Sequence, residues 1–326
     1  KRKRILKGVK FTLSPSPDGR FILYVRDGQV WSHQVKNGRQ RNLTGRLETH
    51  FTDQEDDTLA VEKRPFSSGT WLKDSSAVLL YDRFDIWLIA PDGSRTVKLT
   101  DGGKSRIRHR ISQANFREDD EGALDPARPL YLALYGDRTK KSGYGRLDLS
   151  PEPGPLQTLL WDDKMVLHLD RAEDAPVFSL TMERTELPRD LYVAGPELSN
   201  PRQVTKTNAF QEDFLWGRSE LIDYENKNGV KLQGALTYPA DYQEGRTYPM
   251  VVYIYEKRSQ ELHRYVTPSE KHPYNPAVFS AEGYFVFQPD IAYRPQEPGL
   301  SAVECVVPAV EKVLQTGMID PKRVGL

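Results

Sequence analysis

The sequence predicts two β-rich regions: a partial β-propeller of about four blades over residues 1–217, followed by the N-terminal half of an α/β-hydrolase domain over residues 218–326. Two observations lead to this fold class. The first region repeats a strand-rich pattern with a period of roughly 50 residues, which is typical of propeller blades. The second region reads as strands, then a helix, then a further strand, and this spacing predicts a parallel sheet.

The repeat in the first region is carried by an aromatic residue that precedes a threonine at a constant spacing. The three clear pairs are Trp31 with Thr44, Trp87 with Thr100 and Tyr192 with Thr205, and a weaker copy surrounds Tyr144. Turn signals of the Pro-Asp-Gly type separate the short β-rich runs. We expect the aromatic residues to pack between neighbouring blades, as core residues rather than site residues. Because four blades is the low end of the usual ~4–8, and the chain begins without Met, we expect upstream blades to be missing.

In the second region, five apolar or alternating runs predict strands. They cover residues 220–224, 230–238, 249–255, 284–287 and 323–326. A hairpin-type turn, Asn226-Lys-Asn-Gly229, joins the first two. The run that ends at Tyr255 is almost continuously apolar, as expected for a strand that is buried on both faces.

A helix is predicted between the last two strands. Ser301 and Glu304 form a capping-box pattern, which predicts that the helix begins at Ser301. An apolar stripe at helical spacing runs from Val303 to Leu314, and Pro308 inside it should kink the helix. The single cysteine, Cys305, falls on the apolar face and is interpreted as a buried, inert thiol.

Composition excludes several functional classes. The formal net charge is zero, which argues against a general nucleic-acid binder. No apolar run approaches the ~20 residues of a membrane-spanning helix. The six histidines show no metal-ligand spacing, so the sequence predicts neither a metal nor a cofactor. No signal peptide is visible, and the absence of an initial Met leaves export undecided.

Four motifs resemble one enzyme family. They are Gly229–Pro239 (GVKLQGALTYP), Tyr248–Tyr255 (YPMVVYIY), Gly283–Asp290 (GYFVFQPD) and Ile319–Leu326 (IDPKRVGL). A propeller that runs into such a domain resembles the prolyl oligopeptidase family of serine peptidases, of the dipeptidyl peptidase IV and acylaminoacyl peptidase types. The resemblance covers essentially the whole chain, and it implies peptide substrates, a periplasmic or secreted location and compatibility with a homo-oligomer.

The resemblance also implies where the chemistry lies. The family's nucleophile sits in a Gly-x-Ser-x-Gly turn after the fifth strand, and no such motif occurs up to Leu326. The Ser-Asp-His triad is therefore expected to follow Leu326, and the 326 residues alone are expected to be inactive. Within the chain, the resemblance assigns an oxyanion-hole donor to Tyr255. The loop after this tyrosine departs from the family's glycine-containing pattern.

A second departure follows the predicted fourth strand, where Arg294 stands in place of the family's usual Arg-Gly. Arg294 either faces the substrate or forms a structural salt bridge, and the second interpretation is favoured. Two alternatives to a peptidase remain. One is a non-catalytic propeller that binds peptides or proteins, and the other is an ester or acyl-peptide hydrolase on the same scaffold.

Overall fold

The computed structural model describes residues 4–56, 60, 62–269 and 271–326. The chain divides into two compact units. The first contains the described residues of 1–161, 168–179 and 194–200, and the second contains those of 162–167, 180–193 and 201–326.

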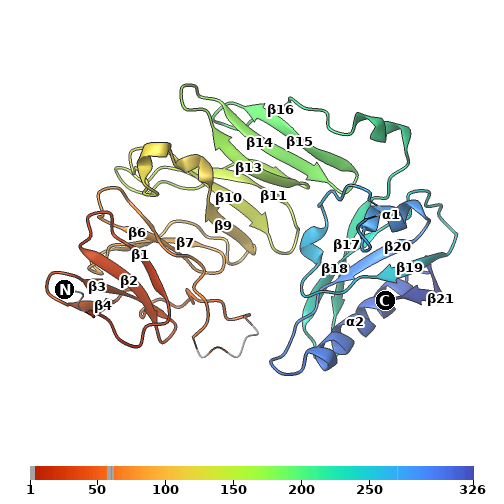
Figure 1. The fold of residues 1–326 in the computed structure, drawn as a ribbon, viewed down its shortest axis with the longest axis horizontal. Helices are drawn as coiled ribbons and strands as arrows, with labels where there is room; N and C mark the ends of the chain where they lie inside the picture. The colour runs from red at the N-terminus through yellow and green to blue at the C-terminus, as the bar shows by residue number, and fades with distance from the viewer. Residues whose placement is uncertain (1–3, 57–59, 61, 270) are drawn as a thin grey trace. The chain divides into compact units, whose positions relative to one another are not determined.

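Four sheets of four strands each make up most of the N-terminal two thirds (Figure 1). Within every sheet, consecutive strands are hydrogen-bonded neighbours. The first two sheets are β1 (Thr12–Pro15), β2 (Phe21–Arg26), β3 (Gln29–Gln34) and β4 (Gln40–Asn42), and β5 (Thr70–Trp71), β6 (Val78–Tyr81), β7 (Ile86–Ile89) and β8 (Thr96–Lys98). The next two are β9 (Ile107–Ile111), β10 (Leu130–Gly136), β11 (Ser142–Leu147) and β12 (Gln157–Asp162), and β13 (Met165–Arg171), β14 (Phe178–Arg184), β15 (Leu187–Ala194) and β16 (Arg202–Gln203). Three short 3₁₀ turns also occur here: η1 (Gln113–Asn115), η2 (Glu118–Asp120) and η3 (Ala209–Asp213).

The sequence repeat coincides with these sheets. Its four aromatic residues all lie on the third strand of their sheet: Trp31 on β3, Trp87 on β7, Tyr144 on β11 and Tyr192 on β15. In the sheets of Trp31, Trp87 and Tyr192, the threonine that follows ties the end of the sheet back to the start of that strand. In the second sheet, Thr100 Oγ1 accepts a hydrogen bond from Ile86 N at 3.1 Å and donates one to Asp85 Oδ1 at 2.8 Å. These two hydrogen bonds require a threonine at a fixed distance from the strand that carries the aromatic residue. This requirement accounts for the constant spacing in the sequence.

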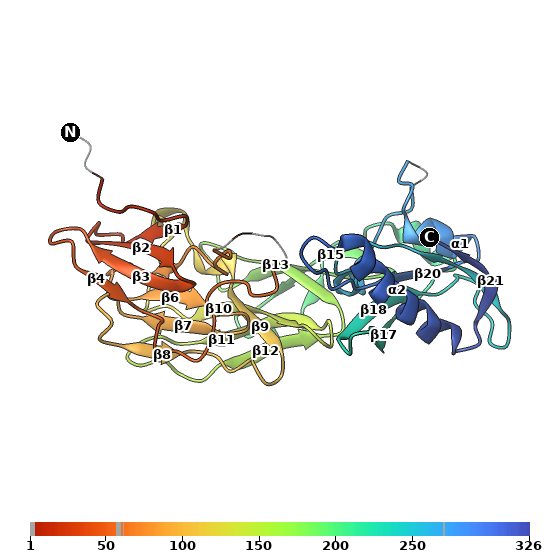
Figure 2. The same cartoon turned by 90° about the horizontal axis from the view of Figure 1, so that it is seen from below.

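Successive sheets of the first unit follow one another in the ribbon (Figure 2), and apolar clusters join them. One cluster packs Leu23 and Val25 of the first sheet against Val78 and Leu80 of the second. A second cluster joins β6 and β7 to β10 and β11. Trp71 adds a polar tie, because its Nε1 donates to the carbonyl oxygen of Ser14 at 2.9 Å. Burial of these strand faces supplies most of the favourable free energy of the unit.

The second unit contains a mixed five-stranded sheet with the order β17-β18-β20-β19-β21. Its strands are β17 (Ser219–Glu225), β18 (Lys231–Thr237), β19 (Tyr248–Val252), β20 (Phe285–Pro289) and β21 (Ile319–Gly325). The pairs β19–β20 and β19–β21 are parallel, whereas β18 is antiparallel to both β17 and β20. The connections carry η4 (Ser259–Glu261), α1 (Pro276–Ala281) and α2 (Pro298–Leu314).

The sequence places helix α2 and most of its buried face correctly, but not its start. The helix begins at Pro298, three residues before the predicted start, and Pro is well suited to the first turn because that N–H has no helical partner. Ser301 is buried and accepts a hydrogen bond from Arg294 N at 3.0 Å, so the predicted capping box is wrong. Ser301, Cys305, Ala309 and Val313 are fully buried, and Val306, Val310 and Leu314 of the predicted stripe pack against the same core. Val303, at the start of the stripe, is 53% exposed.

Two details of the strands also differ from expectation. Strand β19 ends at Val252 rather than Tyr255, because the ladder stops after Tyr253 N donates to Phe287 O at 2.9 Å. The connection to β20 contains helix α1, which the sequence analysis leaves as a loop. Asn275 begins this helix, since its side chain accepts from Ala277 N at 3.0 Å.

Candidate functional site

The loop after β19 presents Tyr255 to solvent at the carboxyl edge of the sheet. The side chain is 64% exposed, and no hydrogen bond to its hydroxyl is formed by the residues that the structure describes. The next residue, Glu256, has φ of +46°, a left-handed conformation that non-glycine residues rarely adopt. Its carbonyl oxygen accepts a hydrogen bond from Ile291 N at 2.8 Å. The loop is thus held by its backbone while the tyrosine side chain stays accessible.

Asp290 anchors this loop from the end of β20. Its carboxylate accepts two hydrogen bonds from Ser259, one from the backbone N and one from Oγ, both at 2.7 Å. Asp290 is buried, its N donates to Gln233 O at 2.8 Å, and its carbonyl oxygen accepts from the Tyr224 hydroxyl. Burial raises the pKa of Tyr224, which keeps this hydroxyl protonated as a donor. We call this arrangement the Asp290 anchor.

Arg294 lies just before helix α2, and its guanidinium forms ion pairs with two carboxylates. Its guanidinium pairs with Glu297 at 2.8 Å and with Glu304, and these two contacts raise its pKa. Glu304 in turn accepts from Asn228 Nδ2 at 2.8 Å, which links the helix to the β17–β18 hairpin. This geometry favours the salt-bridge interpretation of Arg294, and its contact with substrate stays a prediction.

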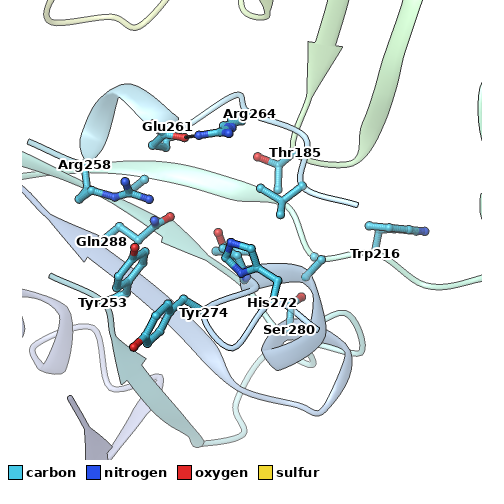
Figure 3. A pocket seen from close by; sticks show the side chains of 16 residues that line it. Thr185, Trp216, Tyr253, Arg258, Glu261, Arg264, His272, Tyr274, Ser280 and Gln288 are labelled. Atoms are coloured by element: carbon cyan, nitrogen blue, oxygen red, sulfur yellow. Dashed lines mark hydrogen bonds and ion pairs between the residues drawn. The ribbon is translucent and has the colours of Figure 1, made fainter. Parts of the chain in front are cut away.

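A pocket of about 240 Å³ lies in the second unit, on the sheet face opposite α2 (Figure 3). Gln288 of β20 and Ala235 of β18 contribute from the sheet, and the loop from Tyr253 to Tyr274 contributes much of the rest. Helix α1, the chain before β17 and Thr185 complete the lining. Tyr253 and Tyr274 stack with ring centroids 5.4 Å apart and planes 7° from parallel. The guanidinium carbon of Arg258 lies 4.7 Å from the Tyr253 centroid.

His263, in the loop between η4 and α1, is a buried titratable group of this unit. Its Nε2 lies 3.2 Å from Asp163 Oδ1. Burial is the largest influence on the pKa of His263 and lowers it; Asp163 and Glu186 act in the opposite direction, and Arg184 adds to the lowering. The folded protein therefore favours the neutral imidazole.

We expect the free energy of unfolding to fall as the pH drops below about 6.5. An unfolded histidine binds a proton in that range, whereas folded His263 binds it only at lower pH, so acid favours the unfolded chain. Urea unfolding at a series of pH values would measure this, and His263→Gln should flatten the profile. His50→Gln, at an exposed position, is the control. An unchanged profile in His263→Gln would contradict the assignment.

Other site classes receive no support from the described residues. Within the parts of the chain that the structure describes, no group of three or more His, Cys, Asp or Glu side chains could hold a metal ion. No helix in the described ranges is long and apolar enough to cross a membrane. The Asp290 anchor and the pocket groups Arg258 and Gln288 were missed by the sequence analysis. An acidic residue directly after a buried strand was the available signal for Asp290.

Comparison with solved structures gives the relatives of this fold. A candidate dipeptidyl aminopeptidase IV of Bacteroides ovatus matches 97% of the chain with a TM-score of 0.64 at 12% identity. A puromycin-hydrolyzing peptidase of Mycobacterium tuberculosis matches 99% with a TM-score of 0.59 at 16% identity. The resemblance to the prolyl oligopeptidase family is confirmed. The chain spans about half the length of these two proteins, covering 47% of the first and 50% of the second.

Sequence comparison agrees over a shorter stretch. Dipeptidyl-peptidase 5 of Aspergillus oryzae is 27% identical over 104 residues, which is 31% of this chain and 14% of that protein. No family model matches the sequence. At these identities, the likeness to the prolyl oligopeptidase family is one of fold, so the reaction has to be argued from the site.

Proposed function

We propose that this chain is part of a serine-type peptidase of the prolyl oligopeptidase family that hydrolyses peptide bonds of oligopeptides. In this proposal the four-stranded sheets are propeller blades that limit access to the site, and the five-stranded sheet is the N-terminal half of an α/β-hydrolase domain. The boundary lies between residues 217 and 218, just before β17 begins at Ser219. The strand order and the single antiparallel strand between β17 and β20 support this assignment.

The register of β21 is the observation that carries the proposal. β21 runs parallel to β19, with Val324 beside Met250 and Gly325 beside Val251. Chain that follows Leu326 therefore leaves the sheet next to the loop that holds Tyr255. A nucleophilic serine in a turn at this point would have the Tyr255 hydroxyl available as an oxyanion donor, which is the geometry that acyl transfer requires.

Within this proposal the roles divide as follows. Tyr255 donates to the oxyanion of the tetrahedral intermediate, and the Ser-Asp-His triad lies beyond residue 326. Asp and His orient and deprotonate the serine, as in other hydrolases of this type. Because no nucleophile motif occurs up to Leu326, we expect the 326 residues alone to be inactive.

Covalent labelling tests the proposal. Treating the full-length protein with a fluorophosphonate should add one label, measured by intact mass, at a serine C-terminal to Leu326. Absence of a label would favour the non-catalytic, peptide-binding alternative. If a label is found, parallel panels of peptide and ester substrates would separate a peptidase from an ester or acyl-peptide hydrolase. The isolated 326 residues serve as the negative control.

A further inference from the structure

Two polar side chains in the pocket lack the partners that buried groups normally have. Gln288 is only 4% exposed, lines the pocket, and forms no side-chain hydrogen bond with any residue that the structure describes. Arg258 Nε is buried and likewise has no partner in the described parts of the chain. Burying the Nε of Arg258 without a hydrogen bond costs about 1–3 kcal/mol, and the Gln288 carboxamide faces the open space of the same pocket. A ligand that reaches both groups would supply the missing bonds.

The charges around the pocket indicate an anionic ligand. Glu261 is neutralised by Arg264, whose Nη1 lies 2.8 Å from Glu261 Oε2. Arg258 is left without a carboxylate partner among the described residues. In Figure 3, Arg258, Gln288 and Tyr253 lie on the same side of the pocket, and the dashed line marks the Glu261–Arg264 pair. A guanidinium and a carboxamide together offer donors suited to both oxygens of a carboxylate.

The size and walls of the pocket limit the rest of the ligand. A volume of about 240 Å³ is smaller than the ~300–1,000 Å³ of pockets for drug-sized molecules. The stacked Tyr253 and Tyr274 rings form an apolar wall, which would pack against an organic group but would contribute nothing to a bare inorganic anion. These features favour a small organic acid over phosphate or sulfate.

We propose that this pocket binds the carboxylate of a molecule of amino-acid to dipeptide size. Arg258 and Gln288 are the hydrogen-bond partners of the carboxylate, and the Tyr253–Tyr274 wall packs against the remainder. Tyr255 does not line the pocket, so the inference goes beyond the proposed oxyanion site. Because binding is measured directly, it stands or fails independently of peptidase activity.

The test uses 3-phenylpropionate and 3-phenylpropionamide, which differ only in the carboxylate and contain no peptide bond. Calorimetry with the full-length protein should give a Kd for the acid roughly tenfold or more below that of the amide, as a charge-assisted hydrogen bond requires. Arg258→Gln should weaken binding of the acid roughly tenfold or more and leave the amide unaffected. Gln288→Leu should weaken the acid as well, without lowering the melting temperature, because it removes an unpaired polar group.

The matched control is the double variant Glu261→Gln with Arg264→Gln, because both residues line the same pocket and removing the ion pair as a whole leaves the net charge of the pocket unchanged. It should leave the affinity for the acid nearly unchanged. Arg258→Lys keeps the charge without Nε and should give an intermediate affinity, which guards against a misfolded Arg258→Gln variant. Equal binding of acid and amide, or no binding at about millimolar concentration, would overturn the proposal. Displacement of the acid by equimolar inorganic phosphate would also overturn it, in favour of a general anion site.

Discussion

Replacing Tyr255 by Phe in the full-length protein is expected to lower kcat by roughly 10²–10³-fold, the usual cost of removing one oxyanion donor. The change deletes only the hydroxyl, which has no hydrogen-bond partner among the described residues and belongs to a side chain that is 64% exposed. The free energy of unfolding should therefore stay nearly the same. Steady-state kinetics on a peptide substrate, with urea unfolding alongside, would measure both quantities.

The matched control for this variant is Tyr284→Phe. Tyr284 is also a partly exposed tyrosine of the second unit, at 36% exposure, but it precedes β20 and lies at the opposite edge of the sheet from Tyr255. Its replacement should leave kcat unchanged. Turnover like that of the wild type in Tyr255→Phe would rule out the oxyanion role, and equal losses in both variants would point to a general structural effect.

Replacing Asp290 by Ala is expected to lower the free energy of unfolding by about 3 kcal/mol, because it leaves two buried donors of Ser259 without partners. The loop that carries Tyr255 should loosen at the same time. Trypsin should then cleave after Lys257 or Arg258 much faster than in the wild type, as followed by mass spectrometry. Peptidase turnover should fall with it, through kcat rather than KM, because Asp290 positions Tyr255 without contacting substrate.

Two further variants separate the charge of Asp290 from its shape. Asp290→Asn keeps a side chain that can bond both groups of Ser259 and should retain much of the stability. Ser259→Ala removes one of the two hydrogen bonds and should give an intermediate loss. If trypsin cleaves Asp290→Ala no faster than the wild type, the anchor does not restrain the loop.

Several elements could be predicted because their signals are local. The aromatic residues and threonines recur along the chain because, in three of the four sheets, the threonine forms the same hydrogen bonds to the start of the third strand, as Thr100 illustrates. The Asn226–Gly229 turn is predicted correctly, because Asn226 Oδ1 accepts from both Asn228 N and Val230 N, and Gly229 supplies a φ of +75°. These interactions span few residues, so they leave a readable pattern.

Errors arose where tertiary contacts override local preference. Ser301 and Glu304 have the spacing of a capping box, yet both lie inside a helix that begins at Pro298. There Ser301 Oγ accepts from Arg294 N, and Glu304 pairs with the Arg294 guanidinium. The predicted valine stripe of α2 is wrong only at Val303 and Val307, which are exposed, while Cys305 and Ala309 are buried with the remainder of the stripe. β19 ends at Val252 because the chain then leaves the strand ladder and enters the loop that Asp290 holds through Ser259.

Periodicity and turn chemistry in the sequence were enough to predict the repeated sheets, the main strands of the second unit and the place of Tyr255 near the end of a buried strand. The Asp290–Ser259 anchor, the two carboxylate partners of Arg294 and the Arg258–Gln288 pocket emerged only from the fold. Asp290 and Ser259 are 31 positions apart, and they meet because β19 and β20 pair in parallel across a long connection. Contacts of that kind depend on strand register and on the path of the connecting loop, and neither is encoded in the neighbouring residues.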